Sequence, residues 1–313
     1  MLLETIRRQR PVCVLFEGVG LLQAVEAVRA EFPGLRLIVD FHNVESRLLA
    51  DVLRARLPRP LRPLTPLVWA RRLAAARQAD RRIARLAGEI WTCSTRDHDH
   101  ARALGIEVPV SVIANPVPQW CLETRGKPLA PAQDILFVGH LRYPPNRRAV
   151  LELCQSIMPR LQQRLPGARL HVCGRSPKAK LKRLVESRGH RLTENPPELR
   201  PVYETAQVAA MPLREGGGTR IKVLEALAVG CPVVATGKAV EGLGLEDGVH
   251  FLKADDAREF AVALEAVMTT PALARRLAEA GRHLVERQFG PATRRAAISA
   301  ALGPKWHEAA GAP

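Results

Sequence analysis

The chain alternates between two patterns of hydrophobic and polar positions. Short runs of β-branched and apolar residues are each followed by a longer stretch in which apolar residues recur every three or four positions. The first pattern is typical of buried parallel strands and the second of amphipathic helices. The alternation therefore predicts an α/β protein with parallel sheets. The predicted strands span 12–16, 36–41, 89–93, 109–114, 134–139, 168–174, 206–212, 231–236 and 249–253.

One polar, proline-rich stretch interrupts this alternation. The sequence "PVPQWCLETRGKPLAPAQ" follows Asn115 and has no hydrophobic period, which indicates a linker. We predict a first domain at 1–118, a linker at 119–133 and a second domain at 134–313. Two doubly wound, Rossmann-like domains that face one another across a cleft are the simplest architecture for this order of elements.

Composition narrows the class of protein. The 313 residues, 47 % of them apolar, allow two ordinary domains with cores. Lys and Arg outnumber Asp and Glu by 47 to 31, a formal charge of +16 that favours a polyanionic partner. Aromatic residues make up only 4 % and do not interleave with the basic runs, so charge is the only feature that points to nucleic acid, and we expect none as a partner.

The cysteines and the chain start predict a cytoplasmic protein. Six cysteines show no CxxC and no paired spacing, and most lie in apolar runs, as reduced buried thiols do. No apolar stretch is long enough to span a membrane, and "MLLETIRRQR" lacks the apolar core of a signal peptide. The prediction is a protein of the cytoplasm, with peripheral contact to the inner face of the cell membrane left open.

The stretch "LREGGGTRIKVLEALAVGCPVVAT", Leu213 to Thr236, contains the main candidate site. A glycine-rich turn lets backbone approach a ligand closely, and the free amides of a helix start bind anions. Arg220 and Lys222 stand at this helix start, where cations oppose the helix dipole. They are best explained by an anion between them and the amides, although local pairing of Lys222 with Glu225 is the alternative.

A second helix start repeats the pattern after the strand "ILFVG". Asn146 is the expected N-cap, and Arg147 and Arg148 follow in the first turn. In a doubly wound sheet both loops follow carboxyl ends of strands and share one crevice. Two basic helix starts at one crevice suit a diphosphate, while arginines that point to solvent are the alternative.

These residues resemble a known family. The segments "ILFVGHLRYPPNRRAV", "RLPGARLHVCGRSP" and "GGGTRIKVLEALAVGCPVV" are similar to the donor-binding half of glycosyltransferase family 4, over about residues 134 to 300. Members are retaining, metal-independent transferases of GT-B fold that use nucleotide sugars. The resemblance implies sugar transfer from a UDP- or GDP-sugar to a polysaccharide or lipid-linked acceptor, with no cofactor and no metal.

The resemblance also implies roles for particular residues. Glu225 would hydrogen-bond the donor ribose, and Arg220 or Lys222 would neutralise the leaving diphosphate. The family's other glutamate is replaced by Gly217, with Glu215 close by, and its loop arginine by His140. The full set of implied donor-binding residues is Gly139, His140, Arg142, Arg147, Glu215, Gly216, Gly217, Gly218, Thr219, Arg220, Lys222 and Glu225.

In the first domain, "LIVDFHNVES" is similar to the family's strand that ends in a cleft-facing histidine. His42 would then lie beside the reacting sugar and, with Glu225, form the catalytic pair. A histidine there can donate a hydrogen bond or handle a proton. His98 and His100 of "RDHDHA" point apart on a helix and lack a third ligand, so we predict no metal site there.

The segment Arg54 to Arg85 carries ten arginines against one acid, Asp80. Interleaved with leucines and Trp69, it could rest on anionic lipid, as in family members with lipid-linked acceptors. A solvated arginine-rich face is the alternative.

By comparison with the family, two or three βα units are expected before the strand at 12–16, so the first domain is expected to be truncated. The half-sheet would then have an open edge at 12–16. A fragment, a split enzyme and a degenerate homologue all fit. A non-catalytic nucleotide-binding or scaffold module is therefore the alternative function.

A third interpretation starts from "VLFEGVGLLQA", where Gly18 and Gly20 follow a strand and Asp40 comes some twenty residues later. This spacing is weakly similar to a nicotinamide-dinucleotide site. The third glycine position holds Gln23, which disfavours an oxidoreductase.

Overall fold

The computed structural model describes residues 1–123, 134–215 and 220–303, and they form two compact units. Unit 1 contains Met1–Asn115 and the chain from Arg294 on, and unit 2 contains Pro116–Glu215 and Arg220–Thr293. Both are built from parallel strands and helices, so the predicted α/β class is confirmed. No helix in the described ranges is long and apolar enough to cross a bilayer.

The sheet of unit 1 has the order β1-β2-β3-β4, and all its pairs are parallel. Its strands are β1 (Cys13–Glu17), β2 (Arg36–Phe41), β3 (Gly88–Thr92) and β4 (Val110–Val112). Because the order never reverses, right-handed crossovers place the connecting helices on one face. The connecting elements are η1 (Val19–Leu21), α2 (Leu22–Glu31), α3 (Glu45–Arg56), η2 (Arg59–Leu64), α4 (Thr65–Val68), α5 (Ala70–Ala87) and α6 (Thr95–Ala103), and α1 (Leu2–Gln9) precedes β1.

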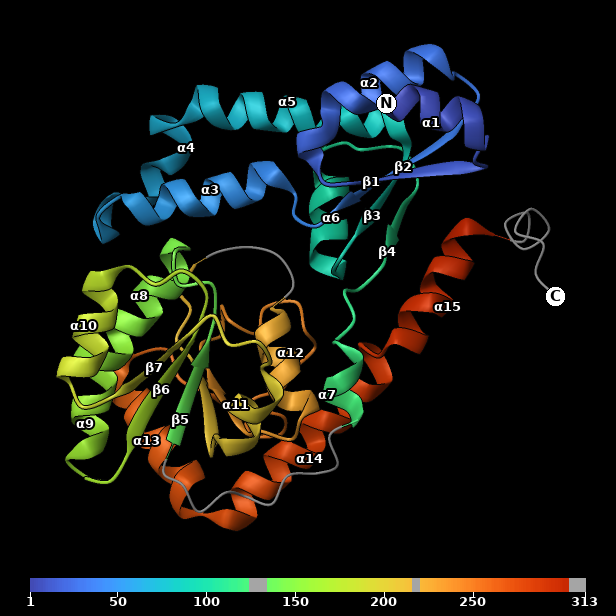
Figure 1. Ribbon diagram of the computed structural model, residues 1–313. Coiled ribbons are helices and arrows are strands. Elements are labelled where there is room, and N and C mark those ends of the chain that lie inside the picture. Colours follow the sequence, from blue (N-terminus) through green and yellow to red (C-terminus); the bar gives the residue numbers. More distant parts are fainter. Residues whose placement is uncertain (124–133, 216–219, 304–313) are drawn as a thin grey trace. The chain divides into compact units, whose positions relative to one another are not determined.

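The two faces of this sheet have separate cores. Val28, Val39 and Ile83 belong to a large buried cluster on the helical face. Ile38 and Trp91 point the other way and pack with Ala297, Ile298 and Leu302 of α15 (Pro291–Leu302). Figure 1 shows α3, α4 and α5 extending beyond the sheet.

Helix α15 joins unit 1 from Arg294 on, although its sequence position predicts that it belongs to the second domain. The reason is specific contact. Arg294 donates to Ala114 O at 3.2 Å and Asn115 Oδ1 at 3.1 Å, and Arg36 donates to Leu302 O at 2.7 Å. A chain terminus that returns to the first unit cannot be read from local pattern, because it depends on these distant partners.

Strand β1 is an edge strand. Among the described residues it pairs only with β2, and Val12 and Leu15 beside its free edge are exposed. The open edge that the sequence predicted at 12–16 is thus present.

The sheet of unit 2 has the order β10-β9-β8-β5-β6-β7, which is the doubly wound order with its reversal at β5. Its strands are β5 (Asp134–Val138), β6 (Arg169–Gly174), β7 (Arg191–Glu194), β8 (Val208–Met211), β9 (Val233–Ala235) and β10 (Leu252–Lys253). Sequence analysis missed β7, whose "RLTE" is polar and outermost. Such an edge strand has no hydrophobic run to mark it.

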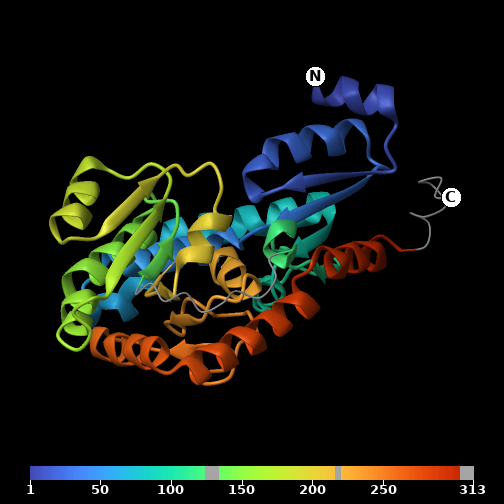
Figure 2. The same ribbon diagram turned by 60° about the horizontal axis from the view of Figure 1, so that its bottom comes forward.

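Helices surround the unit 2 sheet. η3 and α9 pack against α13, and α12 packs against α14 and α7. Figure 2 shows α13 and α14, in orange to red, running along one side of the unit. Their bounds are α7 (Gln119–Glu123), α8 (Pro144–Glu152), η3 (Leu153–Ile157), α9 (Met158–Gln162), α10 (Ala179–Ser187), α11 (Arg200–Thr205), α12 (Ile221–Ala228), α13 (Ala257–Thr269) and α14 (Pro271–Gln288). Helix α7 occupies the start of the predicted linker, and residues 124–133 lie outside the described ranges.

Candidate functional site

The candidate site of unit 2 lies at the carboxyl ends of β5 and β8. These neighbouring strands lie where the strand order reverses, since β5 leads on to β6 at one side and β8 leads on to β9 at the other. Loops diverge at such a reversal and leave a crevice for ligands. Gly139 follows β5, and the loop to α12 follows β8.

Lys222 and Asn146 meet at the end of β5. The Lys222 Nζ donates to Asn146 Oδ1 at 2.5 Å, and Asn146 Nδ2 donates to His140 O at 3.0 Å. A Cβ on Gly139 would lie 2.9 Å from Asn146 Nδ2 and 3.0 Å from Lys222 Nζ. A methyl group at this position would therefore crowd the side-chain ends of Asn146 and Lys222.

Asn146 is not the N-cap that its sequence position suggested. Helix α8 begins two residues earlier, at Pro144, with Tyr143 as N-cap. Proline suits a first helical turn because its missing N–H would have no partner there. Asn146 lies inside that turn with its side chain buried, and its amide joins α8 to α12 through Lys222.

Lys222 is held in an unfavourable environment for a cation. Burial and, secondly, the charge of Arg220 lower the pKa of Lys222 to about 7, while Glu225 opposes the shift. Its Nζ lies 5.3 Å from the centroid of the Phe137 ring. Arg220 is the N-cap of α12 and is itself buried. Two neighbouring cations at a helix N-terminus form an arrangement that an anion would stabilise.

Glu225 lies one turn further along α12 and is almost fully buried. The Tyr203 hydroxyl donates to Glu225 Oε2 at 3.0 Å. Burial raises the pKa of Glu225, and the Tyr203 hydrogen bond and the Lys222 charge act against that rise. Burial likewise raises the pKa of Tyr203 well above its usual value. The phenol thus stays a donor that fixes the carboxyl group.

A hollow of about 540 Å³ lies beside Glu225, and those of its lining residues that the structure describes belong to unit 2. They are Trp120, Pro197, Glu198, Leu199, Arg200 and Glu225. The Trp120 ring lies 6.1 Å from the Tyr203 ring, centroid to centroid. The hollow therefore combines an aromatic surface with a carboxyl group fixed by a hydrogen bond.

The other residues predicted to bind the donor sugar differ in their exposure, and four of them lie outside the described ranges. His140 and Arg142 are exposed and Arg147 is half-buried. Glu215 pairs with Arg148, which ties the β8 loop to α8. Gly216, Gly217, Gly218 and Thr219 lie outside the described residues.

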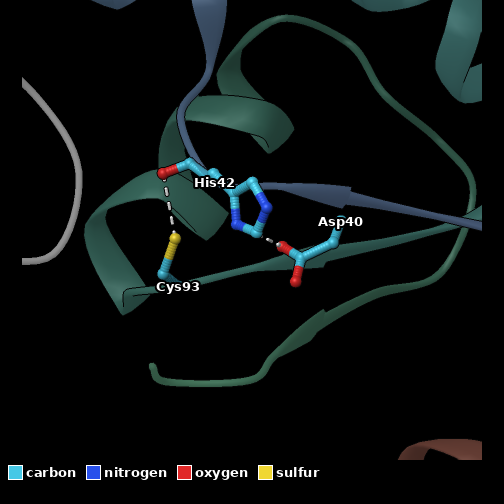
Figure 3. Close-up of side chains that lie close together, drawn as sticks. All are labelled: Asp40, His42 and Cys93. Atoms are coloured by element: carbon cyan, nitrogen blue, oxygen red, sulfur yellow. Dashed lines mark hydrogen bonds and ion pairs between the residues drawn. The ribbon is translucent and has the colours of Figure 1, made fainter. Parts of the chain in front are cut away.

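His42 lies in unit 1, directly after β2. Its Nδ1 is 3.8 Å from Asp40 Oδ1, and the Cys93 thiol donates to the His42 carbonyl at 3.0 Å (Figure 3). The imidazole is 43 % exposed, whereas Asp40 is buried. A half-exposed imidazole against a buried carboxylate is suited to exchange protons with a ligand.

The sequence analysis did not predict the Tyr203 hydrogen bond to Glu225, the place of Trp120 at the hollow, or the hydrogen bond from Lys222 to Asn146. Tyr203 lies in "RPVYET", where one aromatic residue in a short helix carries no signal of a site. Trp120 lies in the segment predicted to be a linker. A tryptophan within a polar, proline-rich stretch is the one available signal, because such a residue usually packs against something.

The first prediction concerns Gly139. Gly139→Ala is expected to lower the free energy of unfolding by about 1–3 kcal/mol, because the added methyl displaces Asn146 and Lys222. Urea denaturation measures the change. Gly34→Ala is the control, since a Cβ at Gly34 would meet nothing within 4 Å. Equal stability of both variants would contradict the crowding at the end of β5.

The second prediction concerns pH. Between pH 7 and the usual lysine pKa of 10.5, the unfolded chain binds a proton at Lys222 that the folded chain does not bind. Stability contributed by this residue therefore rises with pH in that window, by roughly 1–3 kcal/mol over two pH units. Urea denaturation at pH 7 and pH 9 measures the rise, and Lys222→Met should remove it. An identical pH dependence in the variant would contradict a depressed lysine pKa.

One family model matches part of the second unit. Residues 132–270 match the family model described as "Glycosyl transferases group 1". No curated protein sequence matches the chain.

Solved structures share the fold at low sequence identity. Sucrose-phosphate synthase from Thermosynechococcus elongatus is 18 % identical with a TM-score of 0.71, over 100 % of this chain and 77 % of that one. HepE from Anabaena is 15 % identical with a TM-score of 0.67, over 92 % and 77 %. TarM from S. aureus is 12 % identical with a TM-score of 0.60, over 74 % and 47 %. The chain thus spans about half the length of TarM. Its fold is that of the GT-B glycosyltransferases.

Proposed function

Residues 132–270 match the family model of the group 1 glycosyl transferases, and from this we propose that the chain is a retaining glycosyltransferase. It transfers a sugar from a UDP- or GDP-sugar to a polysaccharide or lipid-linked acceptor. The observation that carries the proposal is the buried Lys222, which Asn146 holds at the reversal of the unit 2 sheet beside Arg220. These two cations bind the diphosphate of the donor and neutralise it as it leaves.

The hollow beside Glu225 takes the nucleoside. Glu225 accepts hydrogen bonds from the ribose hydroxyls, and Trp120 provides an aromatic surface for the base. The solved structure of HepE contains UDP and glucose, and that of TarM contains UDP. These ligands favour uridine as the base, with guanosine as the alternative. In this scheme no metal is needed on the diphosphate, because Lys222 and Arg220 supply the positive charge.

Turnover assays test the proposal. The chain is incubated in EDTA with a UDP-sugar or a GDP-sugar, and the released nucleoside diphosphate is measured. We expect release above the background of a Glu225→Ala, His42→Ala double variant. Nucleotide binding without any release would favour the alternative function, a non-catalytic nucleotide-binding or scaffold module.

The acceptor side includes a membrane-facing surface. At the η2–α4 tip, Leu61, Leu64, Leu67 and Val68 are exposed by 45 %, 45 %, 79 % and 55 %. Arg71 and Arg72 follow at once, both exposed, and Arg72 lies over the Trp69 ring. Exposed apolar side chains flanked by arginines suit the interface of an anionic bilayer. We place the protein at the cytoplasmic face of the cell membrane, which also suits cysteines that form no disulfide within the described ranges.

A third prediction tests this surface. Leu67→Ser with Val68→Ser should weaken binding to vesicles that contain phosphatidylglycerol by roughly tenfold to a hundredfold, because two exposed apolar anchors are lost. Vesicle co-sedimentation measures binding. Val262→Ser, an exposed valine on α13, is the matched control and should bind as the wild type does. Equal binding of all three proteins would show that Leu67 and Val68 do not anchor the chain, and equal binding to neutral vesicles would show that the arginines do not contribute.

A further inference from the structure

A second cluster of reactive side chains belongs to unit 1, whereas the proposed nucleotide site belongs to unit 2. Asp40 at the end of β2, His42 just after it and Cys93 just after β3 come from neighbouring strands of the sheet. Their ligand atoms all lie within 4.8 Å of one another. Figure 3 shows the Asp40 carboxylate facing the His42 ring, with the Cys93 sulfur at the His42 carbonyl.

The buried Asp40 carboxylate has an oxygen without a hydrogen-bond partner. Asp40 is 1 % exposed, and its Oδ1 is buried with no hydrogen-bond partner. The His42 Nδ1 lies 3.8 Å from this oxygen, Arg294 also attracts the carboxylate, and Glu17 repels it. Arg294 donates to Ala114 O and Asn115 Oδ1. An unsatisfied buried oxygen destabilises the folded chain, and a cation bound there would give this oxygen a partner.

The donor set selects the type of cation. One carboxylate oxygen, one imidazole nitrogen and one thiolate sulfur suit Zn²⁺, whereas Mg²⁺ and Ca²⁺ prefer oxygen ligands alone. Tetrahedral Zn²⁺ with bonds of about 2.0–2.3 Å places its ligand atoms roughly 3.3–3.8 Å apart. The Asp40 Oδ1 to His42 Nδ1 distance of 3.8 Å already meets this condition.

We propose that Asp40, His42 and Cys93 form a Zn²⁺ site with three protein ligands and one open position. The half-exposed imidazole gives the ion a path from solvent. On binding, the Cys93 thiol gives up its hydrogen bond to the His42 carbonyl and releases its proton to water as the S–Zn bond forms. The structure holds the three ligands on the ends of two rigid strands.

One consequence rests on the proposed function. Because His42 is the residue proposed to act at the reacting sugar, Zn²⁺ on its imidazole removes it from proton transfer and inhibits turnover. The site itself does not depend on this step, so Zn²⁺ binding and turnover are measured separately.

Cobalt substitution tests the site directly. The full chain, freed of metal with a chelator, is titrated with Co²⁺ and then with Zn²⁺. We expect one equivalent of Co²⁺ to give the near-ultraviolet sulfur-to-cobalt absorption and the visible bands of tetrahedral Co²⁺, and Zn²⁺ to abolish both. Cys93→Ser should lose the sulfur absorption, and Asp40→Asn and His42→Asn should each weaken Zn²⁺ binding by roughly a hundredfold or more.

Cys13→Ser is the control, since Cys13 is a free cysteine on β1 outside the cluster. It should keep both the absorption and the affinity. His42→Asn changes a half-exposed residue, so it provides a folded variant even where a buried substitution fails. A wild-type chain without the sulfur absorption, or a Cys93→Ser chain that keeps it, would overturn the proposal. A wild-type chain that turns over its donor but binds no Zn²⁺ would overturn the zinc site and leave the proposed function unaffected.

Discussion

Lys222→Met is expected to weaken binding of UDP by about 3 kcal/mol, roughly a hundredfold. In the native chain the Lys222 Nζ is held by Asn146 at the carboxyl end of β5, where the doubly wound sheet directs a ligand. Methionine keeps a side chain of similar length but removes the charge that we propose to face the diphosphate. The nucleoside uridine, which has no phosphate, should bind the variant and the wild type equally.

Calorimetric titration of both ligands measures this difference. Arg164→Met is the matched control: Arg164 also belongs to unit 2 and pairs with Glu265, and it precedes the amino end of β6. It should bind UDP as the wild type does. A Lys222→Met chain that binds UDP with unchanged affinity would show that the lysine does not face the diphosphate.

His42→Asn is expected to lower the rate of sugar transfer by about 10²–10⁴, the usual contribution of a positioned proton-transfer group. The affinity for UDP should stay the same, because the Lys222 and Glu225 sites lie in unit 2. Asparagine keeps a polar side chain after β2 but cannot exchange a proton. The effect should therefore appear in kcat.

Release of UDP from the donor under saturating conditions measures kcat. His98→Asn is the control, since His98 is also in unit 1 but pairs with Asp99 on the first turn of α6. It should keep the wild-type rate. An equal decrease of kcat in His42→Asn and His98→Asn, or an unchanged kcat in both, would show that His42 does not take part in the reaction.

Local pattern is sufficient to predict most of the fold. The strand predicted at 36–41 has these bounds in the structure, and every other strand except β7 overlaps its prediction. Parallel strands buried on both faces have continuous apolar runs, which is why they can be recognised. Strand β7 and the destination of α15 are missed, because a polar edge strand and a returning helix depend on contacts with residues far away in sequence.

The sequence suggests the candidate site where the charge of a residue conflicts with its place in a helix. Two cations at the start of α12 oppose the helix dipole, and this conflict in the sequence already points to Arg220 and Lys222. The Lys222–Asn146 contact cannot be found in the same way, because it joins residues 76 positions apart. The order of strands and helices predicts which loops lie at the same edge of the sheet, but it does not predict which side chains of these loops are in contact.

The most direct test of the central claim is calorimetric titration of the wild-type chain with UDP, GDP and the two nucleosides in EDTA. The account predicts that at least one diphosphate binds with a stoichiometry of one and far more tightly than its nucleoside. The absence of binding to either diphosphate, by a chain whose circular dichroism shows it to be folded, would contradict a nucleoside diphosphate site at the end of β5.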